Sequence, residues 1–157
     1  MSAPARRVRP TGASKSRLRL WIQMLRTTRA VEAQLRESLR QDFDATLPQF
    51  DVMAALYRFP EGMLMSELSR YLMVSNGNVT GIVTRLVDDG FVLRALRNGD
   101  RHTSVVMLSK RGLKRFEQMA ARHEAWVDQL LNEFSGRDAT SLAKRLRESN
   151  PQSRRQS

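Results

Sequence analysis

Cysteine is absent from the 157-residue sequence, and only two histidines are present. The lack of cysteine excludes disulfide bonds, thiolate metal sites and cysteine-based redox sensing, and it is typical of a reducing compartment. A metal sensor would need carboxylates for almost all of its ligands. No glycine-rich phosphate loop or nucleophile elbow occurs either, so we expect neither an enzyme nor a bound cofactor or metal.

Long apolar runs and acidic residues are also scarce. No run approaches the ~18 residues that a membrane span requires. The basic N-terminal stretch lacks the apolar centre of a signal peptide, so we expect a cytoplasmic protein. Lysine and arginine number 27 against 16 aspartates and glutamates, which gives a net charge of +11. Such an excess favours a polyanionic partner, either nucleic acid or an anionic membrane surface.

The segment Ser75–Phe91 is predicted to form an amphipathic helix. Ser75 is a good N-cap residue, and Gly90 suits the left-handed position after the helix end. Apolar residues recur at steps of three and four, namely Val79, Ile82, Val83, Leu86 and Val87. The opposite face carries side chains able to bond base edges and phosphates, namely Asn76, Asn78, Thr80, Thr84 and Arg85. We predict that this helix reads DNA.

Two glycines interrupt the outer face of this helix. Gly77 and Gly81 each cost about 1 kcal/mol of helix stability relative to alanine. Close approach to a DNA phosphate or to a neighbouring helix would compensate for that cost, and the sequence leaves both explanations open.

A shorter helix and a hairpin are predicted on either side of the reading helix. Ser66 is expected to cap the helix that ends at Leu72, and the short turn before Ser75 gives the dimensions of a helix-turn-helix. Two β-prone runs, 91–96 and 104–108, flank an Asn98-Gly99 turn. Basic side chains lie at or near the tip of this hairpin: Arg97, Arg101 and His102. The hairpin is therefore interpreted as a wing that enters the minor groove.

Long helices are predicted at both ends of the chain. Apolar residues keep helical spacing over about 14–43 and 109–134, and a last helix follows over about 138–148. A short core helix begins at Leu47-Pro48 and ends before Pro60. The apolar stripes of the long helices exceed what a small fold can cover, which indicates a dimerisation layer. Residues 1–13 and 149–157 are expected to be flexible, and the arginines of the N-terminal arm would either contact DNA or be solvated.

This order of elements resembles the MarR family of winged helix-turn-helix regulators. The resemblance is carried by residues 47–112, above all by TRLVDDGFV (84–92) and DRHTSVVMLSKRG (100–112). It implies a mainly α fold with a small β-wing, in which a single domain spans 14–148. The winged helix-turn-helix head would occupy about 47–112, and the dimerisation helices about 14–44 and 109–148.

The resemblance also implies partners and a mechanism. Family members are typically homodimeric repressors that bind a pseudo-palindromic operator in double-stranded DNA and release it when a small aromatic ligand binds; no membrane partner is implied. The segments 47–62 and 74–83 look like the branch that senses aromatic acyl-coenzyme A thioesters. The candidate pocket, in which core packing is the simpler role for each residue, comprises Trp21, Leu25, Arg29, Phe50, Met53, Tyr57, His123 and Trp126.

The wing departs from the family pattern. That pattern is Asp-x-Arg, in which the aspartate orients an arginine toward the minor groove. Asp100 matches, but His102 stands in the arginine position, and Arg101 is the residue able to substitute for it. The DNA contacts implied overall are Ser66, Ser75, Asn76, Asn78, Thr80, Thr84, Arg85, Arg97, Arg101 and His102.

Two other functions remain open from the sequence. A DNA-binding regulator or architectural protein that responds to no ligand would have the same sequence features. RNA binding is disfavoured because the chain lacks the aromatic-studded sheet on which bases stack.

Overall fold

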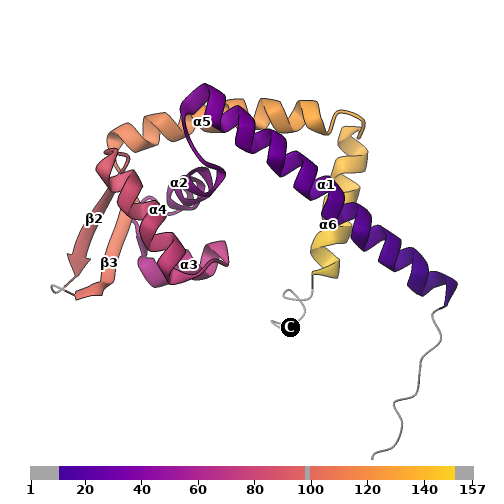
Figure 1. Ribbon diagram of the computed structural model, residues 1–157, viewed down its shortest axis with the longest axis horizontal. Helices are drawn as coiled ribbons and strands as arrows, with labels where there is room; N and C mark the ends of the chain where they lie inside the picture. Colours follow the sequence, from indigo (N-terminus) through magenta and orange to yellow (C-terminus); the bar gives the residue numbers. More distant parts are fainter. Residues whose placement is uncertain (1–10, 98–99, 151–157) are drawn as a thin grey trace, which may run out of the picture.

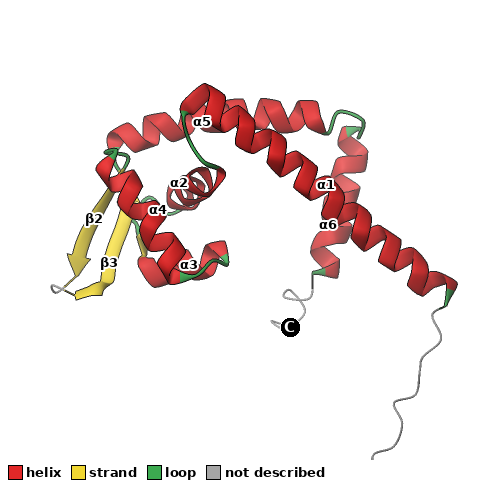
Figure 2. Ribbon diagram, in the orientation of Figure 1, coloured by secondary structure: helices red, strands yellow, loops and turns green. Residues whose placement is uncertain are grey.

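In a computed structural model the chain is described over residues 11–97 and 100–150, with the side chains of residue 97 and residues 100–102 left out of that description. Six helices and three strands lie in these ranges (Figures 1 and 2). In chain order they are α1 (Gly12–Phe43), α2 (Leu47–Arg58), β1 (Met63–Leu64), α3 (Met65–Leu72), α4 (Asn76–Asp88), β2 (Val92–Arg97), β3 (Asp100–Leu108), α5 (Lys110–Leu130) and α6 (Gly136–Ser149). The mainly α fold with a small β-wing is confirmed.

The helix α1 is long but packs only near its C-terminal end. The Thr11 hydroxyl accepts a hydrogen bond from the Ser14 N–H, and Asp44 ends the helix in a left-handed conformation with φ of 50°. Leu35 and Leu39 are buried against the head, whereas Leu18 and Trp21 are 58% and 55% exposed. The N-terminal half of α1 therefore presents an apolar stripe that no other part of the described chain covers.

The small sheet connects the helix-turn-helix to the long helices. Its strand order is β1-β3-β2 and both pairings are antiparallel, with Met63 opposite Val106 and Val92 opposite Leu108. The strand β1 has only two residues, too few for a period-two pattern, so the sequence did not reveal it. β3 begins at Asp100, earlier than the 104–108 run suggested, because the hairpin pairs almost to its tip.

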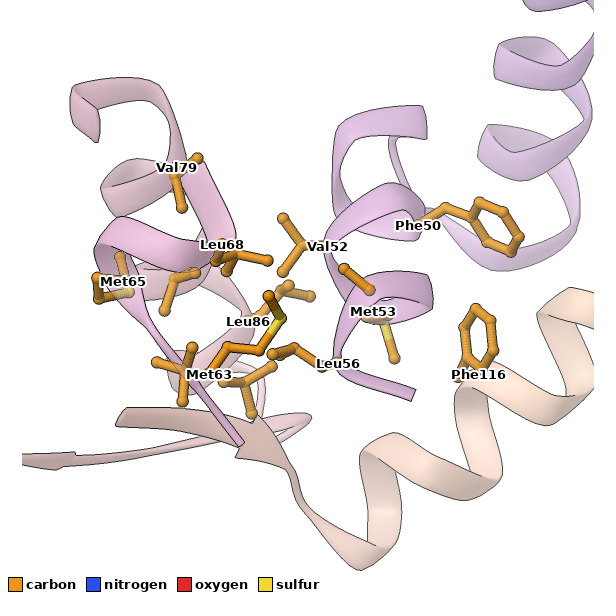
Figure 3. Packing of buried hydrophobic residues seen from close by; sticks show 14 of the residues in the cluster. Phe50, Val52, Met53, Leu56, Met63, Met65, Leu68, Val79, Leu86 and Phe116 are labelled. Carbon is orange, nitrogen blue, oxygen red and sulfur yellow. The ribbon is translucent and has the colours of Figure 1, made fainter. Parts of the chain in front are cut away.

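One hydrophobic core holds the head together. Figure 3 shows that Val52 and Leu56 point from α2 toward Leu68 and Leu86, whereas Phe50 points the other way toward Phe116 of α5. The rings of Phe50 and Phe116 are 5.5 Å apart between centroids. Both faces of α2 are therefore used, one for the helix-turn-helix and one for α5, and α2 joins the two parts.

Several expected boundaries are corrected by the structure. Ser66 does not cap α3: this helix begins at Met65, and Glu67 in its first turn accepts a hydrogen bond from the Leu64 N–H at 2.9 Å. The fifth helix ends at Leu130 and not at residue 134, since the next residues form turns. Residues 12 and 13, assigned to the flexible arm, already belong to α1, and residue 149 belongs to α6. The rest of the arm and tail, 1–10 and 151–157, lies outside the described residues.

The last helix buries none of its residues. Figure 1 shows α6 turning away at the end of α5 that is distant from the head. Leu142 and Leu146 are 43% and 50% exposed. Over the part of the chain that the structure describes, no helix combines the length and the apolar composition needed to cross a membrane.

Gly112 is the position where the fold most clearly requires a glycine. A Cβ atom there would lie 1.8 Å from the carbonyl oxygen of Phe91, which is backbone and cannot move aside. We expect Gly112→Ala to lower the free energy of unfolding by about 1–3 kcal/mol, the usual range for overpacking. In the control Gly81→Ala the new methyl meets nothing within 4 Å, so stability should rise by about 1 kcal/mol. Urea unfolding of both variants tests this, and equal effects would contradict it.

Candidate nucleic-acid interface

The helix α4 divides into a buried face and an exposed one. Val79, Val83 and Leu86 are buried in the head core. The Ser75 hydroxyl accepts a hydrogen bond from the Asn78 N–H at 3.4 Å, which confirms Ser75 as the N-cap. Gly90 has a φ of +80°, as expected for the position after the helix. The predicted reading residues are all exposed: Asn76, Asn78, Thr80, Thr84 and Arg85.

The two threonines of this face direct their hydroxyl protons inward. Thr80 Oγ1 donates to the carbonyl oxygen of Asn76, and Thr84 Oγ1 donates to that of Thr80, each at 2.8 Å. Their lone pairs and methyl groups are then what remains for a partner. Thr80 and Thr84 are thus able to accept from exocyclic amino groups or to contact thymine methyls in the major groove.

The two glycines of α4 have no neighbouring atoms on the side where a side chain would lie. A Cβ atom added to Gly77 or to Gly81 would meet nothing within 4 Å. Packing against a neighbouring helix of the same chain is therefore excluded as the reason for these glycines, at least among the described residues. The other expected reason, close approach to a DNA phosphate, stays a prediction.

Arg85 is the one cation among the predicted reading residues of α4. Its Nε lies 3.3 Å from Oδ2 of Asp89, and its side chain is 70% exposed. An exposed pair one helical turn apart is worth only about 0.3–0.5 kcal/mol. This pairing therefore orients the guanidinium without preventing it from contacting a phosphate or a base.

The turn between α3 and α4 is held by a contact that the sequence did not reveal. Met73 adopts a left-handed conformation with φ of 58°, unusual for a residue with a side chain. The buried Ser69 hydroxyl donates to the carbonyl oxygen of Val74 at 2.6 Å. Ser69 therefore fixes the path of the turn and with it the angle at which α4 leaves α3. Ser66 lies on the exposed side of α3.

The β2–β3 hairpin projects from the head as a wing (Figure 1). Arg97 pairs with Asp100 across its end, and a register irregularity occurs between Ala95 and Arg97. Residues 98–99 lie outside the described residues, and the side chains of Arg97, Asp100, Arg101 and His102 are not described. The expected roles of these four side chains therefore stay predictions.

The candidate pocket residues separate into two groups. Phe50 and Met53 are buried in the core, His123 stacks on Phe50 with 4.4 Å between ring centroids, and Tyr57 lies 4.9 Å from Phe116. Trp126 meets Phe43 edge to face at 6.3 Å. Among the described residues no ring contact joins Trp21 to this aromatic group. Trp21 and Leu25 belong instead to the N-terminal half of α1, and Arg29 lies just past its midpoint; only Leu25 of the three is partly buried.

An open cavity lies along α5 beside this aromatic group. Its volume is about 630 Å³, and its lining residues all belong to α5: Ala121, His123, Glu124, Ala125, Val127 and Asp128. His123 is therefore shared by the core and the cavity. Among the side chains that the structure describes, no three His, Asp or Glu residues gather closely enough to hold a metal ion.

Three comparisons relate this architecture to known proteins. A model of the MarR family matches residues 45–103. The transcriptional activatory protein BadR of Rhodopseudomonas palustris is 35% identical over 116 residues, 72% of this chain, and the match spans 61% of the length of BadR. The crystal structure of a MarR family transcriptional regulator from Silicibacter pomeroyi is 33% identical with a TM-score of 0.74, over 88% of this chain and 95% of that one.

A structure that contains DNA is also similar. A mutant of MarR from E. coli, complexed with operator DNA, has a TM-score of 0.75 at 22% identity, over 90% of this chain and all of that one. At this identity the likeness concerns the fold alone.

The half-buried His123 gives stability a specific pH dependence. Burial lowers the pKa of His123 below its ordinary value, so the unfolded chain takes up a proton at a higher pH than the folded one. The stabilisation from neutral His123 is complete above about pH 6.5, the unfolded pKa, and is lost as the pH falls through the lower folded pKa. We expect His123→Phe, which keeps an aromatic ring on Phe50, to lose less stability than wild type between about pH 7.5 and 5.5.

Chemical denaturation of both proteins at the two pH values measures this difference. Burial, and to a smaller extent the charge of Glu32, raises the pKa of Asp51. Asp51 is present in both proteins, so its contribution to the pH dependence of stability cancels in the comparison. Parallel pH profiles for wild type and variant would contradict the assignment to His123.

Proposed function

The chain belongs to the MarR family of DNA-binding transcriptional regulators, and we propose that it is a homodimeric repressor that reads a pseudo-palindromic operator with α4 and the β2–β3 wing. The observation that carries this proposal is the outer face of α4. This face is exposed and packs against no other described part of the chain. At its two glycines, Gly77 and Gly81, an added Cβ atom would meet nothing within 4 Å. The net charge of +11 provides attraction to phosphates.

The proposed DNA contacts come mainly from α4 and from the β2–β3 wing. From α4 and its N-cap they are Ser75, Asn76, Asn78, Thr80, Thr84 and Arg85, and Ser66 reaches from α3. From the wing they are Arg97, Arg101 and His102, with Asp100 orienting its neighbours. Major-groove contacts by α4 would specify bases, and wing contacts in the minor groove would add affinity that depends less on sequence.

The homodimer is proposed because the apolar surface outside the head has no partner among the described residues. Leu18 and Trp21 on α1, and Leu142 and Leu146 on α6, are 43–58% exposed. Monomeric proteins rarely leave large contiguous apolar patches in water. A second copy related by a twofold axis would cover the same surface on both chains. It would also place two α4 helices for successive major grooves, about 34 Å apart.

Release by an effector is proposed from the arrangement around α5. The open cavity of about 630 Å³ lies along α5 and includes His123, whose ring stacks on Phe50 of the head. A ligand there would release DNA by favouring a dimer geometry in which the two α4 helices no longer match the operator. We propose that the effector is a small aromatic compound, and specifically an aromatic acyl-coenzyme A thioester.

Binding to the operator can be tested at Arg85. We expect Arg85→Ala to weaken binding to an operator selected from a random duplex library by about 1–3 kcal/mol, the usual value of one good base contact. Arg36→Ala is a matched control, because Arg36 on α1 is also exposed and also pairs one turn away, with Glu32 at 3.4 Å. Gel-shift titration of both variants measures the difference. Equal affinities for Arg85→Ala and Arg36→Ala would contradict the role of α4.

Control by an effector needs a separate experiment. We expect a panel of aromatic acids and their coenzyme A thioesters to contain a compound that raises Tm and releases the operator at the same concentrations. Operator binding that no compound changes would support a ligand-independent regulator or architectural protein instead. A promoter fusion carrying the selected operator decides between repression and the activation that the name of BadR describes for that protein.

A further inference from the structure

A second basic surface lies at the start of α5, away from the wing tip and next to the C-terminal end of α4. Its three cations, here called the α5 basic cluster, lie in the first two turns of α5: Arg111, Lys114 and Arg115. Arg111 and Arg115 lie over the ring of Phe91. Together with Phe91 and Gln118 the three cations line an open cavity of about 180 Å³. No acidic residue belongs to that lining.

The charges of this cluster are unfavourable for the chain on its own. None of the three side chains forms an ion pair with any residue in the described ranges. Arg111 and Arg115 are four residues apart, so they face each other as like charges, which destabilises a helix. The first turn of α5 contains no acidic residue, and cations near a helix N-terminus oppose the helix dipole. A bound anion would reverse all of these unfavourable interactions.

Two of the three cations also have structural contacts. Arg111 Nη1 donates to the carbonyl oxygen of Asp89 at 3.1 Å, and its guanidinium lies 4.9 Å from the centre of the Phe91 ring. Arg115 donates to the carbonyl oxygen of Phe43 and lies over the Phe43 and Phe91 rings at 5.0 and 5.6 Å. Lys114 forms no hydrogen bond or ion pair with a described residue, so packing does not account for it. The two guanidiniums are held in place, and Lys114 adds a third, free cation.

We infer that the α5 basic cluster binds the phosphate groups of a small anion. Guanidinium and ammonium groups that converge on one cavity match the charge and hydrogen-bond acceptors of a phosphate. The volume suits one or two phosphate groups, because pockets for whole drug-sized ligands measure about 300–1,000 Å³. Phe91 supplies an apolar floor for a carbon group next to the phosphate.

The cluster is distant from the tip of the wing, but its Arg111 bonds Asp89, the ion-pair partner of Arg85. It lies at the end of β3 opposite the hairpin tip, and nine residues of β3 span about 27 Å. Figure 1 shows α5 starting at that distant end of the wing. The cluster instead adjoins the C-terminal end of α4, because Arg111 bonds the carbonyl oxygen of Asp89. An anion bound by Arg111 would therefore lie next to the C-terminal end of α4, the helix proposed to read DNA.

The test compares Lys114→Gln with Arg26→Gln in the full-length protein. Arg26 is an exposed cation on α1, so the control removes one positive charge at a distance from the cluster. Pyrophosphate is titrated into each protein by calorimetry at constant ionic strength, without divalent cations. We expect Lys114→Gln to weaken pyrophosphate binding about tenfold, the effect of one charge-assisted hydrogen bond. Arg26→Gln should bind pyrophosphate as tightly as wild type.

A second measurement separates binding from folding. Lys114→Gln removes a cation from the second turn of α5, near the helix N-terminus, so Tm without anion should be equal to or above that of wild type. Competition with coenzyme A, which contains phosphate groups of the same chemistry, shows whether the anion is a free phosphate or part of a larger ligand.

Three results would overturn the inference. One is pyrophosphate binding that is undetectable in wild type. Another is an equal loss of binding in Lys114→Gln and Arg26→Gln, which would mean a general response to net charge. The third is unchanged pyrophosphate binding in Lys114→Gln together with weaker operator binding and a smaller salt dependence, which would assign the cluster to the DNA backbone. The operator affinity of Arg85→Ala reports on the proposed function separately.

Discussion

The tightest constraint in the molecule is the contact between the first turn of α5 and the backbone at the end of α4. Gly112 leaves no room for a side chain beside the Phe91 carbonyl. The Ser109 N–H donates to that same carbonyl at 3.0 Å, and the Ser109 hydroxyl donates to the Gly90 carbonyl at 2.7 Å. These bonds join the end of α4, the base of the wing and the start of α5. As a consequence, α4 and the wing keep one orientation relative to α5, which extends away from the head.

This junction explains how a distant event would affect DNA binding. The helix α5 extends away from the head (Figure 1), and the open cavity that includes His123 lies along it. The helix α2 contacts α5 through Phe50 and contacts the helix-turn-helix through Val52 (Figure 3). Interiors packed in this way transmit displacement because they contain few voids. A change in the angle between two copies of α5 would therefore move two α4 helices as rigid parts, in keeping with the mechanism proposed for the dimer.

Much of this architecture could be predicted from residues alone. The capping role of Ser75 and the left-handed Gly90 were read correctly, because caps and positive φ angles depend on neighbours within a few residues. The apolar period placed Val79, Val83 and Leu86 in the core for the same reason. The prediction that Ser66 caps α3 is wrong. The cap is formed by the backbone of Leu64 and the carboxylate of Glu67, and the position of Leu64 depends on its place in β1. Since β1 has two residues, only its pairing with β3 defines it.

The sequence by itself determined the reading helix, the hairpin, the long helices and the family, since each depends on periodicity, turn residues or local motifs. Only the tertiary structure decided which residues meet across the chain. It separated the candidate pocket residues of α1 from those around Phe50, and it gathered Arg111 and Arg115 against a phenylalanine about twenty residues earlier. It also showed that no helix of the described chain packs on Gly77 or Gly81. Local rules cannot give such results, because contacts between distant residues follow from how whole elements pack.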